Sequence, residues 1–296
     1  MRILNFLSLK FIKNSQIYLK IYAKIRNLKV KLAQMLKKGG KLEFVNYLGD
    51  GNVAKFMLLF ARVAGIFVFF PFFSHINIPN VIKATLALFL TMFLFPLAKL
   101  ETPQYNTFFV LQLISEAIFG MIAGLLLMLV FAIVQFAGEQ MAFTMGFTMA
   151  SVMDPSTGGS VPITSQILGL LALLVFLAFD GHHLSLLFLS NSLSYITLGE
   201  FYLQENLLNY LNTAMFNVFI IGFTMAFPIL AINLLADLIF GLLMKTMPQF
   251  NLLVVGYPMK IALAFVVLIV TLVIMMEYFK ELMLKVFSNM QTLFFI

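Results

Sequence analysis

The sequence contains no cysteine and no tryptophan among its 296 residues. The absence of cysteine excludes a disulfide framework, a thiolate metal site and thiol catalysis. Charged residues make up only 10% of the chain, whereas a soluble domain carries roughly 25%. Hydrophobic residues make up 62%, and the mean hydropathy is +1.01. Water therefore cannot be the main solvent for this surface, and the composition predicts an integral membrane protein.

Positive charge is concentrated at the start of the chain. Eleven of the nineteen Lys and Arg residues lie between Met1 and Lys41, which contains no acid, so the remainder has a net charge of −4. We therefore do not expect nucleic acid as a partner. Alternation of Lys with apolar residues predicts a basic amphipathic extension, residues 1–43, on an anionic membrane surface. Two alternatives stay open: a dispensable extension, and a translated upstream stretch with the true start at Met35.

Six hydrophobic segments are candidates to cross roughly 30 Å of hydrocarbon as helices. A shorter apolar stretch, Leu184–Leu198, is expected either to return beside the preceding helix or to lie along the interface. If all six segments cross the membrane, the basic loop residues do not all fall on the same side of it. The sequence therefore predicts an all-α, polytopic membrane protein in which some helices do not span fully. The six segments are Val53–Phe73, Val81–Ala98, Phe108–Phe136, Ile163–Phe179, Ala214–Ala236 and Ile261–Met276.

Methionine recurs at every fourth position after Gly138. On a helix of 3.6 residues per turn, such a row winds slowly round the axis. A parallel row of small residues, Ala142, Gly146 and Ala150, lets another backbone approach closely. We therefore expect a deformable surface that faces protein, in a pore or a packing contact. Its methionines are Met141, Met145, Met149 and Met153.

The chain directly after this row cannot continue as a helix. Proline removes backbone donors, and paired glycines relax the backbone. Irregular backbone at membrane depth is tolerated only inside protein or against a water-filled cavity. The residues of this irregular loop are Asp154, Pro155, Ser156, Thr157, Gly158, Gly159, Ser160 and Pro162.

Charged residues within apolar segments are candidates for function, because a charge in hydrocarbon normally faces the bundle interior or a pathway. Glu116, Gly120 and Gly124 are spaced four apart, which places the carboxylate on a close-packing face. We expect a structural pair between Arg62 and a carboxylate, and a proton relay stays open as the alternative. The intramembrane candidates are Arg62, Glu116, Glu139, Asp180 and Asp237.

The sequence gives no positive sign of an enzyme, and we expect neither metal nor cofactor. His182 and His183 follow Asp180, but adjacent helical residues point about 100° apart, and His75 is the one further histidine. Asp180 and Asp237 lack the Gly-x-Gly-Asp pattern of membrane aspartyl proteases. No nucleophile elbow, phosphate loop or dinucleotide fingerprint is present.

A second polar run separates the last two hydrophobic segments. It is typical of a defined turn, which we place at the cytoplasmic face. Its apolar middle, Leu252–Val255, would be left in water by an ordinary connector, so we expect a partner to cover it. The predicted contact residues are Lys245, Pro248, Gln249, Asn251, Gly256, Pro258 and Lys260.

Four stretches, in the same order and between about Phe56 and Phe279, resemble the FliR family of flagellar export-gate proteins, whose counterparts serve virulence-type type III secretion. The chain departs from the family pattern at Lys245-Thr246, where an arginine usually stands shortly before the Pro-Gln pair. The four stretches are Arg62-Val63-Ala64-Gly65 leading to Pro71; Ala137-Gly138-Glu139-Gln140 leading to Met145-Gly146; Asp154-Pro155-Ser156 with Pro162 and Phe176-Leu177-Ala178-Phe179-Asp180-Gly181-His182; and Met247-Pro248-Gln249-Phe250-Asn251 with Gly256-Tyr257-Pro258-Met259-Lys260.

The resemblance implies a gate subunit of tilted helical hairpins in the bacterial inner membrane, at the flagellar basal body. Its implied partners are the gate proteins FliP and FliQ, FlhB on the cytoplasmic side, FlhA, membrane lipid, and the unfolded flagellar proteins that are exported. It also implies that residues 151–162 plug the central pore, with residues 44–296 as the gate domain. A secondary transporter that uses Arg62, Glu116 and Asp237 stays open as the alternative, although we see no internal repeat.

Overall fold

The computed structural model describes residues 50–71, 79–98, 108–147, 162–247 and 252–295. The chain divides into two units, residues 1–53 and 54–296. Only residues 50–53 of the first unit belong to the described part, so the predicted basic extension lies outside it.

The described residues form helices joined by short connections, and no strand occurs among them. All six predicted segments are helical, which confirms the all-α prediction. Five helices are long and apolar enough to span a membrane, or six if α7 and α8 form one broken span. The elements are α3 (Asp50–Phe69), α4 (Asn80–Leu94), the 3-10 turn η1 (Phe95–Leu97), α5 (Phe109–Met145), α7 (Ile163–Ala178), α8 (Gly181–Tyr195), α9 (Glu205–Thr246), the π-helical turn η3 (Leu252–Gly256) and α10 (Tyr257–Phe294).

Three helices are far longer than a bilayer requires. Helices α5, α9 and α10 contain 37, 42 and 38 residues. At 1.5 Å per residue they extend about 55 to 63 Å, against about 30 Å of hydrocarbon. Hydropathy marks only the part of a helix that suits hydrocarbon. The sequence analysis therefore ended the segments of α9 and α10 at Ala236 and Met276, whereas the helices continue beyond both.

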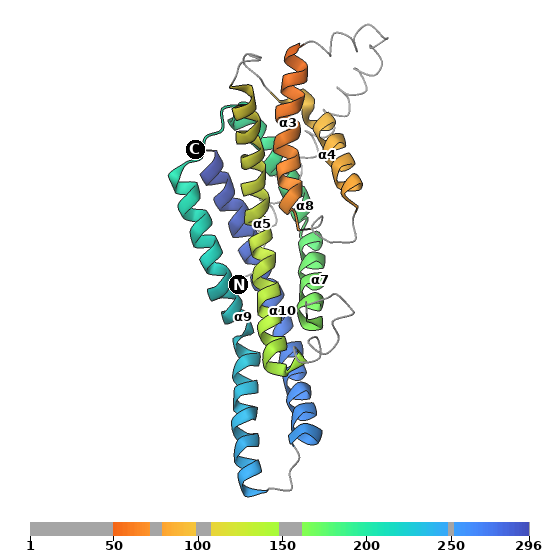
Figure 1. The fold of residues 1–296 in the computed structure, drawn as a ribbon, viewed down its shortest axis with the longest axis vertical. Coiled ribbons are helices and arrows are strands. Elements are labelled where there is room, and N and C mark those ends of the chain that lie inside the picture. The colour runs from red at the N-terminus through yellow and green to blue at the C-terminus, as the bar shows by residue number, and fades with distance from the viewer. Residues whose placement is uncertain (1–49, 72–78, 99–107, 148–161, 248–251, 296) are drawn as a thin grey trace, which may run out of the picture. The chain divides into compact units, whose positions relative to one another are not determined.

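Helices α7 and α8 meet at a bend of 63°. Asp180 at the junction has a left-handed backbone with φ of 60°, and a Cβ at Gly181 would lie 2.3 Å from the Phe176 ring. A glycine is therefore required at this position. Of the two alternatives for Leu184–Leu198, the return arm does not fit, because the bend does not reverse the chain direction and α8 leads on from the end of α7 (Figure 1). The alternative along the interface stays a prediction.

Helix α5 is central to residues 54–296 and packs closely against α3 (Figure 1). A Cβ at Gly120 would lie 2.2 Å from the carbonyl oxygen of Arg62, and one at Gly124 would lie 2.6 Å from that of Ile66. Gly65 faces Gly120 from the other helix. The later residue on α5, Gly124, contacts the later residue on α3, Ile66, so the two helices run parallel. The predicted close-packing face of α5 is confirmed.

Phenylalanine rings fill the contacts that α5 makes with the other helices. The Phe131 ring meets Phe176 of α7 edge-on at 5.5 Å and Phe279 of α10 at 5.1 Å between centroids. On α9, Gly222 lies so close that a Cβ would be 2.6 Å from the Phe136 ring. Because lipid tails are as apolar as these side chains, close packing rather than water exclusion must hold such helices together.

Candidate functional site

A buried ion pair joins α3 to α5. The side chains of Arg62 and Glu116 are both 0% exposed. Arg62 donates through Nη2 to Glu116 Oε1 at 2.8 Å and through Nε to Oε2. The guanidinium also lies 4.6 Å from the centre of the Phe119 ring. Two parallel donors and an aromatic face give the pair the fixed geometry that Arg provides and Lys does not.

The pair of Arg62 and Glu116 also forms hydrogen bonds with α8 and with the residues that follow it. Arg62 Nη1 donates to Ser192 Oγ at 3.3 Å and to the carbonyl oxygen of Ile196 at 3.5 Å. The backbone N–H of Gly199 donates to Glu116 Oε1 at 2.7 Å. We call these five groups the Arg62 cluster. Because both charges are buried and fully paired, the geometry favours a structural role over a proton relay.

A second ion pair joins α9 to α10. Lys260 Nζ donates to both carboxylate oxygens of Asp237 at 2.7 Å. The Lys260 side chain is 9% exposed and that of Asp237 is 54% exposed. Lys260 therefore fastens the hairpin of its own chain, whereas the sequence analysis expected it at a partner contact. Glu139, another intramembrane candidate, is exposed on α5.

The two helices that flank the predicted pore-plug loop are held against each other. Helix α5 ends at Gly146, whose φ of 85° fits a glycine cap. Earlier on α5, the carbonyl of Gly138 accepts a hydrogen bond from Thr164 Oγ1 at 3.0 Å, and that of Gln135 accepts one from Ser165 Oγ at 2.9 Å. Pro162 is the N-cap residue of α7. The rest of the loop, residues 154–161, lies outside the described part.

The methionine row is only partly described. Met141 and Met145 are both 0% exposed, so they pack inside this chain and do not form an open surface. Met149 and Met153 lie outside the described residues. Met141 and Met145 therefore fit the expected packing contact, and they do not fit the expected pore surface.

One polar contact close to the end of α5 was not expected from the sequence. Asn233 of α9 is 1% exposed and donates through Nδ2 to Thr144 Oγ1 at 3.1 Å. Its Oδ1 is buried without a hydrogen-bond partner among the described residues. The contact fixes α9 against α5 two residues before the Gly146 cap. The amide of Asn233 within the apolar stretch of α9 was the signal that could have revealed it.

Asp180, His182 and His183 lie together at the junction of α7 and α8. One ligand atom from each falls within 4.8 Å of the others, and His183 Nδ1 lies 3.3 Å from Asp180 Oδ1. The sequence analysis treated the two histidines as pointing apart, and their ring centres are 4.1 Å apart. His183 and Asp180 remain 58% and 42% exposed, so this is a loose surface group.

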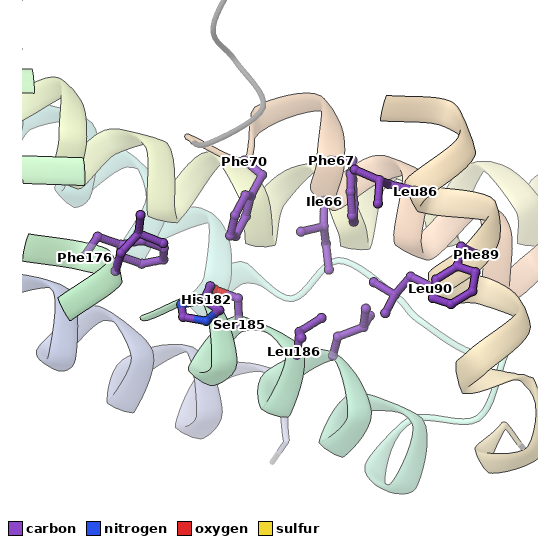
Figure 2. Close-up of a pocket in the computed structure, with 12 residues that line it drawn as sticks. Ile66, Phe67, Phe70, Leu86, Phe89, Leu90, Phe176, His182, Ser185 and Leu186 are labelled. Atoms are coloured by element: carbon purple, nitrogen blue, oxygen red, sulfur yellow. The ribbon is translucent and has the colours of Figure 1, made fainter. Parts of the chain in front are cut away.

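An apolar cavity of about 310 Å³ lies between α3, α4, α7 and α8 (Figure 2). Phe70, Phe89 and Phe176 are among its lining residues, and His182 and Ser185 are its polar lining residues in the described part. Ser185 Oγ donates to the carbonyl of Gly181 at 2.9 Å and is therefore satisfied. Such a lining offers little to a polar solute.

The turn between α9 and α10 is also partly described. Lys245 and Pro258 are exposed, and Gly256 is buried. Within the apolar middle, Val254 is 67% exposed and Val255 is 42% exposed. Pro248, Gln249 and Asn251 lie outside the described residues.

A family model described as bacterial export proteins, family 1, matches residues 53–286. The chain belongs to this family. It is 36% identical to the flagellar biosynthetic protein FliR of Bacillus subtilis (strain 168) over 219 residues, which are 73% of this chain and 85% of that protein. Identity is 29% to FliR of Pectobacterium carotovorum, over 80% of this chain and 91% of the relative. It is 26% to FliR of Escherichia coli (strain K12), over 77% and 87%.

This bacterial export protein is a membrane-embedded subunit of the flagellar export apparatus and associates with other export components. The predicted family and function are confirmed, and no finding favours the solute-transporter alternative. The match begins at residue 53, so the basic extension lies outside it. Arg62, Glu116, Asp237 and Lys260 all lie within the matched range.

Proposed function

We propose that this chain is a non-enzymatic gate subunit that helps to form and close the pore for unfolded flagellar proteins. It acts in the bacterial cytoplasmic membrane at the flagellar basal body, with FliP, FliQ, FlhB and FlhA as its partners. Residues 44–296 form the gate domain, and residues 1–43 are a basic extension at the membrane surface. The family match supports export, and the geometry around the irregular loop supports the gate.

One observation carries the gate assignment: the two helices that flank the loop are fixed to each other. Helix α5 ends at Gly146, and α7 resumes after Pro162 with Thr164 and Ser165 bound to the backbone of α5. A Cβ at Gly138 would lie 2.6 Å from Ser165 Cα, so the two helices are in backbone contact here. Helices fixed in this way hold the two attachment points of a glycine-containing loop in place, which suits a stopper.

The mechanism is steric. The loop closes a narrow channel at rest and limits ion leakage, and an exported chain displaces it on entry. Among the described residues no phosphate-binding loop supplies energy, so the driving force comes from other components. The ion pair of Arg62 with Glu116 holds α5, one of the two helices that flank the loop, against α3, and the pair of Lys260 with Asp237 holds α9 against α10.

The outward faces of α9 and α10 support assembly with partner subunits and lipid. Their exposed side chains are large and apolar along most of both helices, beyond what a bilayer of about 30 Å can cover. FliP and FliQ are the proposed neighbours on these faces, and FlhB is the proposed partner over Val254 and Val255. The most exposed of these side chains are Phe216, Phe227, Leu234, Leu238, Val266, Ile269, Val270, Val273 and Ile274.

The test is deletion of Ser156 to Ser160 in the gate complex assembled with its partners. Proton and ion leakage through the resting complex should rise, because the shortened loop no longer fills the channel. Co-purification with the partners should persist, because the anchors at Thr164 and Ser165 remain. A matched control removes five residues of the basic extension, which should leave leakage unchanged. Unchanged leakage in the loop deletion would contradict the plug assignment.

A further inference from the structure

A cavity of about 210 Å³ lies between α5, α9 and α10, apart from the loop that the gate assignment uses. Its floor is apolar and comes from α5, with Leu129, Val130 and Ile133 among the residues that form it. Its other walls come from the first third of α9 and the last third of α10. Clefts between the helices of a bundle are common ligand sites.

The polar side chains around this cavity are hydrogen-bond donors. Lys285 contributes an ammonium group, Asn217 an amide and Tyr210 a hydroxyl. Asn289 Nδ2 donates to the Tyr210 oxygen at 3.1 Å, which leaves the hydroxyl hydrogen of Tyr210 to point elsewhere. No acidic side chain of the described part lines the cavity. A positive charge beside two neutral donors is complementary to an anion.

The nearest acid along α10 forms no ion pair with Lys285 in the described structure. Glu281 lies four residues before Lys285, and both side chains are exposed. The described structure contains no ion pair between the two. The ammonium group of Lys285 is thus available to a group outside the chain.

The spacing between Lys260 and Lys285 on α10 matches the thickness of a bilayer. Lys285 follows Lys260 by 25 residues, which is about 37 Å of helix at 1.5 Å per residue. The partner of Lys260, Asp237, is 54% exposed, which places that end near headgroups or water. A bilayer with its headgroups is about 40 to 45 Å thick. Lys285 therefore reaches the headgroup layer opposite the α9–α10 turn.

We propose that this cavity binds an anionic phospholipid, with its phosphate at Lys285, Asn217 and Tyr210 and one acyl chain along the floor of α5. The hydrogen-bond donors are complementary to the phosphate, and the apolar floor is complementary to the acyl chain. The distance along α10 places the phosphate in the headgroup layer and the acyl chain in the hydrocarbon, as in a bilayer. A zwitterionic lipid carries a compensating positive charge and gains less from Lys285. The site holds three helices together at the surface opposite the turn, which is a role separate from pore closure.

The absence of tryptophan from the chain provides the test. Leu282→Trp places an indole at the cavity, in the gate complex assembled with its partners and reconstituted into lipid nanodiscs. Its fluorescence is taken as the difference from the complex without the substitution. Brominated phosphatidylglycerol should half-quench this signal at about a five-fold lower mole fraction than brominated phosphatidylcholine, the preference expected for one basic residue at a membrane surface.

Lys285→Gln should remove the preference, whereas Lys280→Gln, an exposed lysine on the same helix that does not line the cavity, should keep it. Equal quenching by both lipids would overturn the anionic site. No quenching by either lipid would show that a partner chain covers the cavity and would also overturn it. Displacement by inorganic phosphate alone would indicate a free-anion site instead. Ile221→Trp, on the opposite wall, replaces Leu282→Trp if that complex does not assemble.

Discussion

Lys260 donates to both carboxylate oxygens of Asp237 at 2.7 Å, but the two side chains differ in exposure. The side chain of Lys260 is 9% exposed, whereas that of Asp237 is 54% exposed. The two members of the pair thus differ in what they lose when the other is removed. Asp237 can be hydrated where it stands. The ammonium group of Lys260 has little access to solvent and depends on its partner.

The two single substitutions should therefore have unequal effects. Lys260→Met should cost about 1 kcal/mol, because the carboxylate left behind is solvated. Asp237→Leu should cost about 3 kcal/mol, because it leaves a buried ammonium group unpaired. Thermal unfolding of the purified complex measures both, and Lys280→Met, at an exposed lysine on α10 outside both ion pairs, is the control with no expected effect. The reverse order would show that the pair stabilises mainly through the carboxylate.

The Arg62 cluster should respond more strongly, because both charges are 0% exposed. Arg62→Met should destabilise the fold by about 3 to 5 kcal/mol, since Glu116 would be buried without its partner. The double substitution Arg62→Met with Glu116→Leu should recover much of this loss, because it leaves no buried charge. Unfolding midpoints and yields of assembled complex give the comparison. A double variant no more stable than the single variant would mean that contacts to Ser192 and Gly199 dominate.

Glycine positions on α5 and α9 offer a matched pair for testing backbone contact. A Cβ at Gly120 would lie 2.2 Å from the Arg62 carbonyl oxygen, whereas one at Gly241 would meet nothing within 4 Å. Gly120→Ala should separate α3 from α5 and lower the yield of assembled complex. Gly241→Ala should be neutral or stabilise α9 by up to about 1 kcal/mol, because alanine favours helix. Equal behaviour of the two variants would argue against the close contact.

The sequence predicted the helices and the buried charged residues better than it predicted helix lengths and the contacts between helices. Hydropathy located every described long helix, and spacing of Glu116, Gly120 and Gly124 indicated the face that packs on α3. It stopped α9 and α10 too early, because each apolar run is interrupted by a charged residue, Asp237 or Glu277, that does not end the helix. The pairing of Lys260 with Asp237 and of Asn233 with Thr144 joins residues 23 and 89 positions apart. Such pairs depend on how helices pack, which one sequence does not specify.

Asp180 has a left-handed backbone with φ of 60°. Substitutions at this position can therefore show whether the residue matters for its backbone conformation or for its carboxylate. Most side chains lose roughly 1 to 2 kcal/mol in this conformation, whereas glycine adopts it freely. Asp180→Gly should therefore preserve stability and swimming motility, since the exposed contact with His183 contributes little. Asp180→Val should lower both, because a β-branched residue strains the junction of α7 and α8. Unfolding midpoints and swimming assays compare the two variants. Loss of motility with normal stability in Asp180→Gly would instead assign a chemical role to the carboxylate.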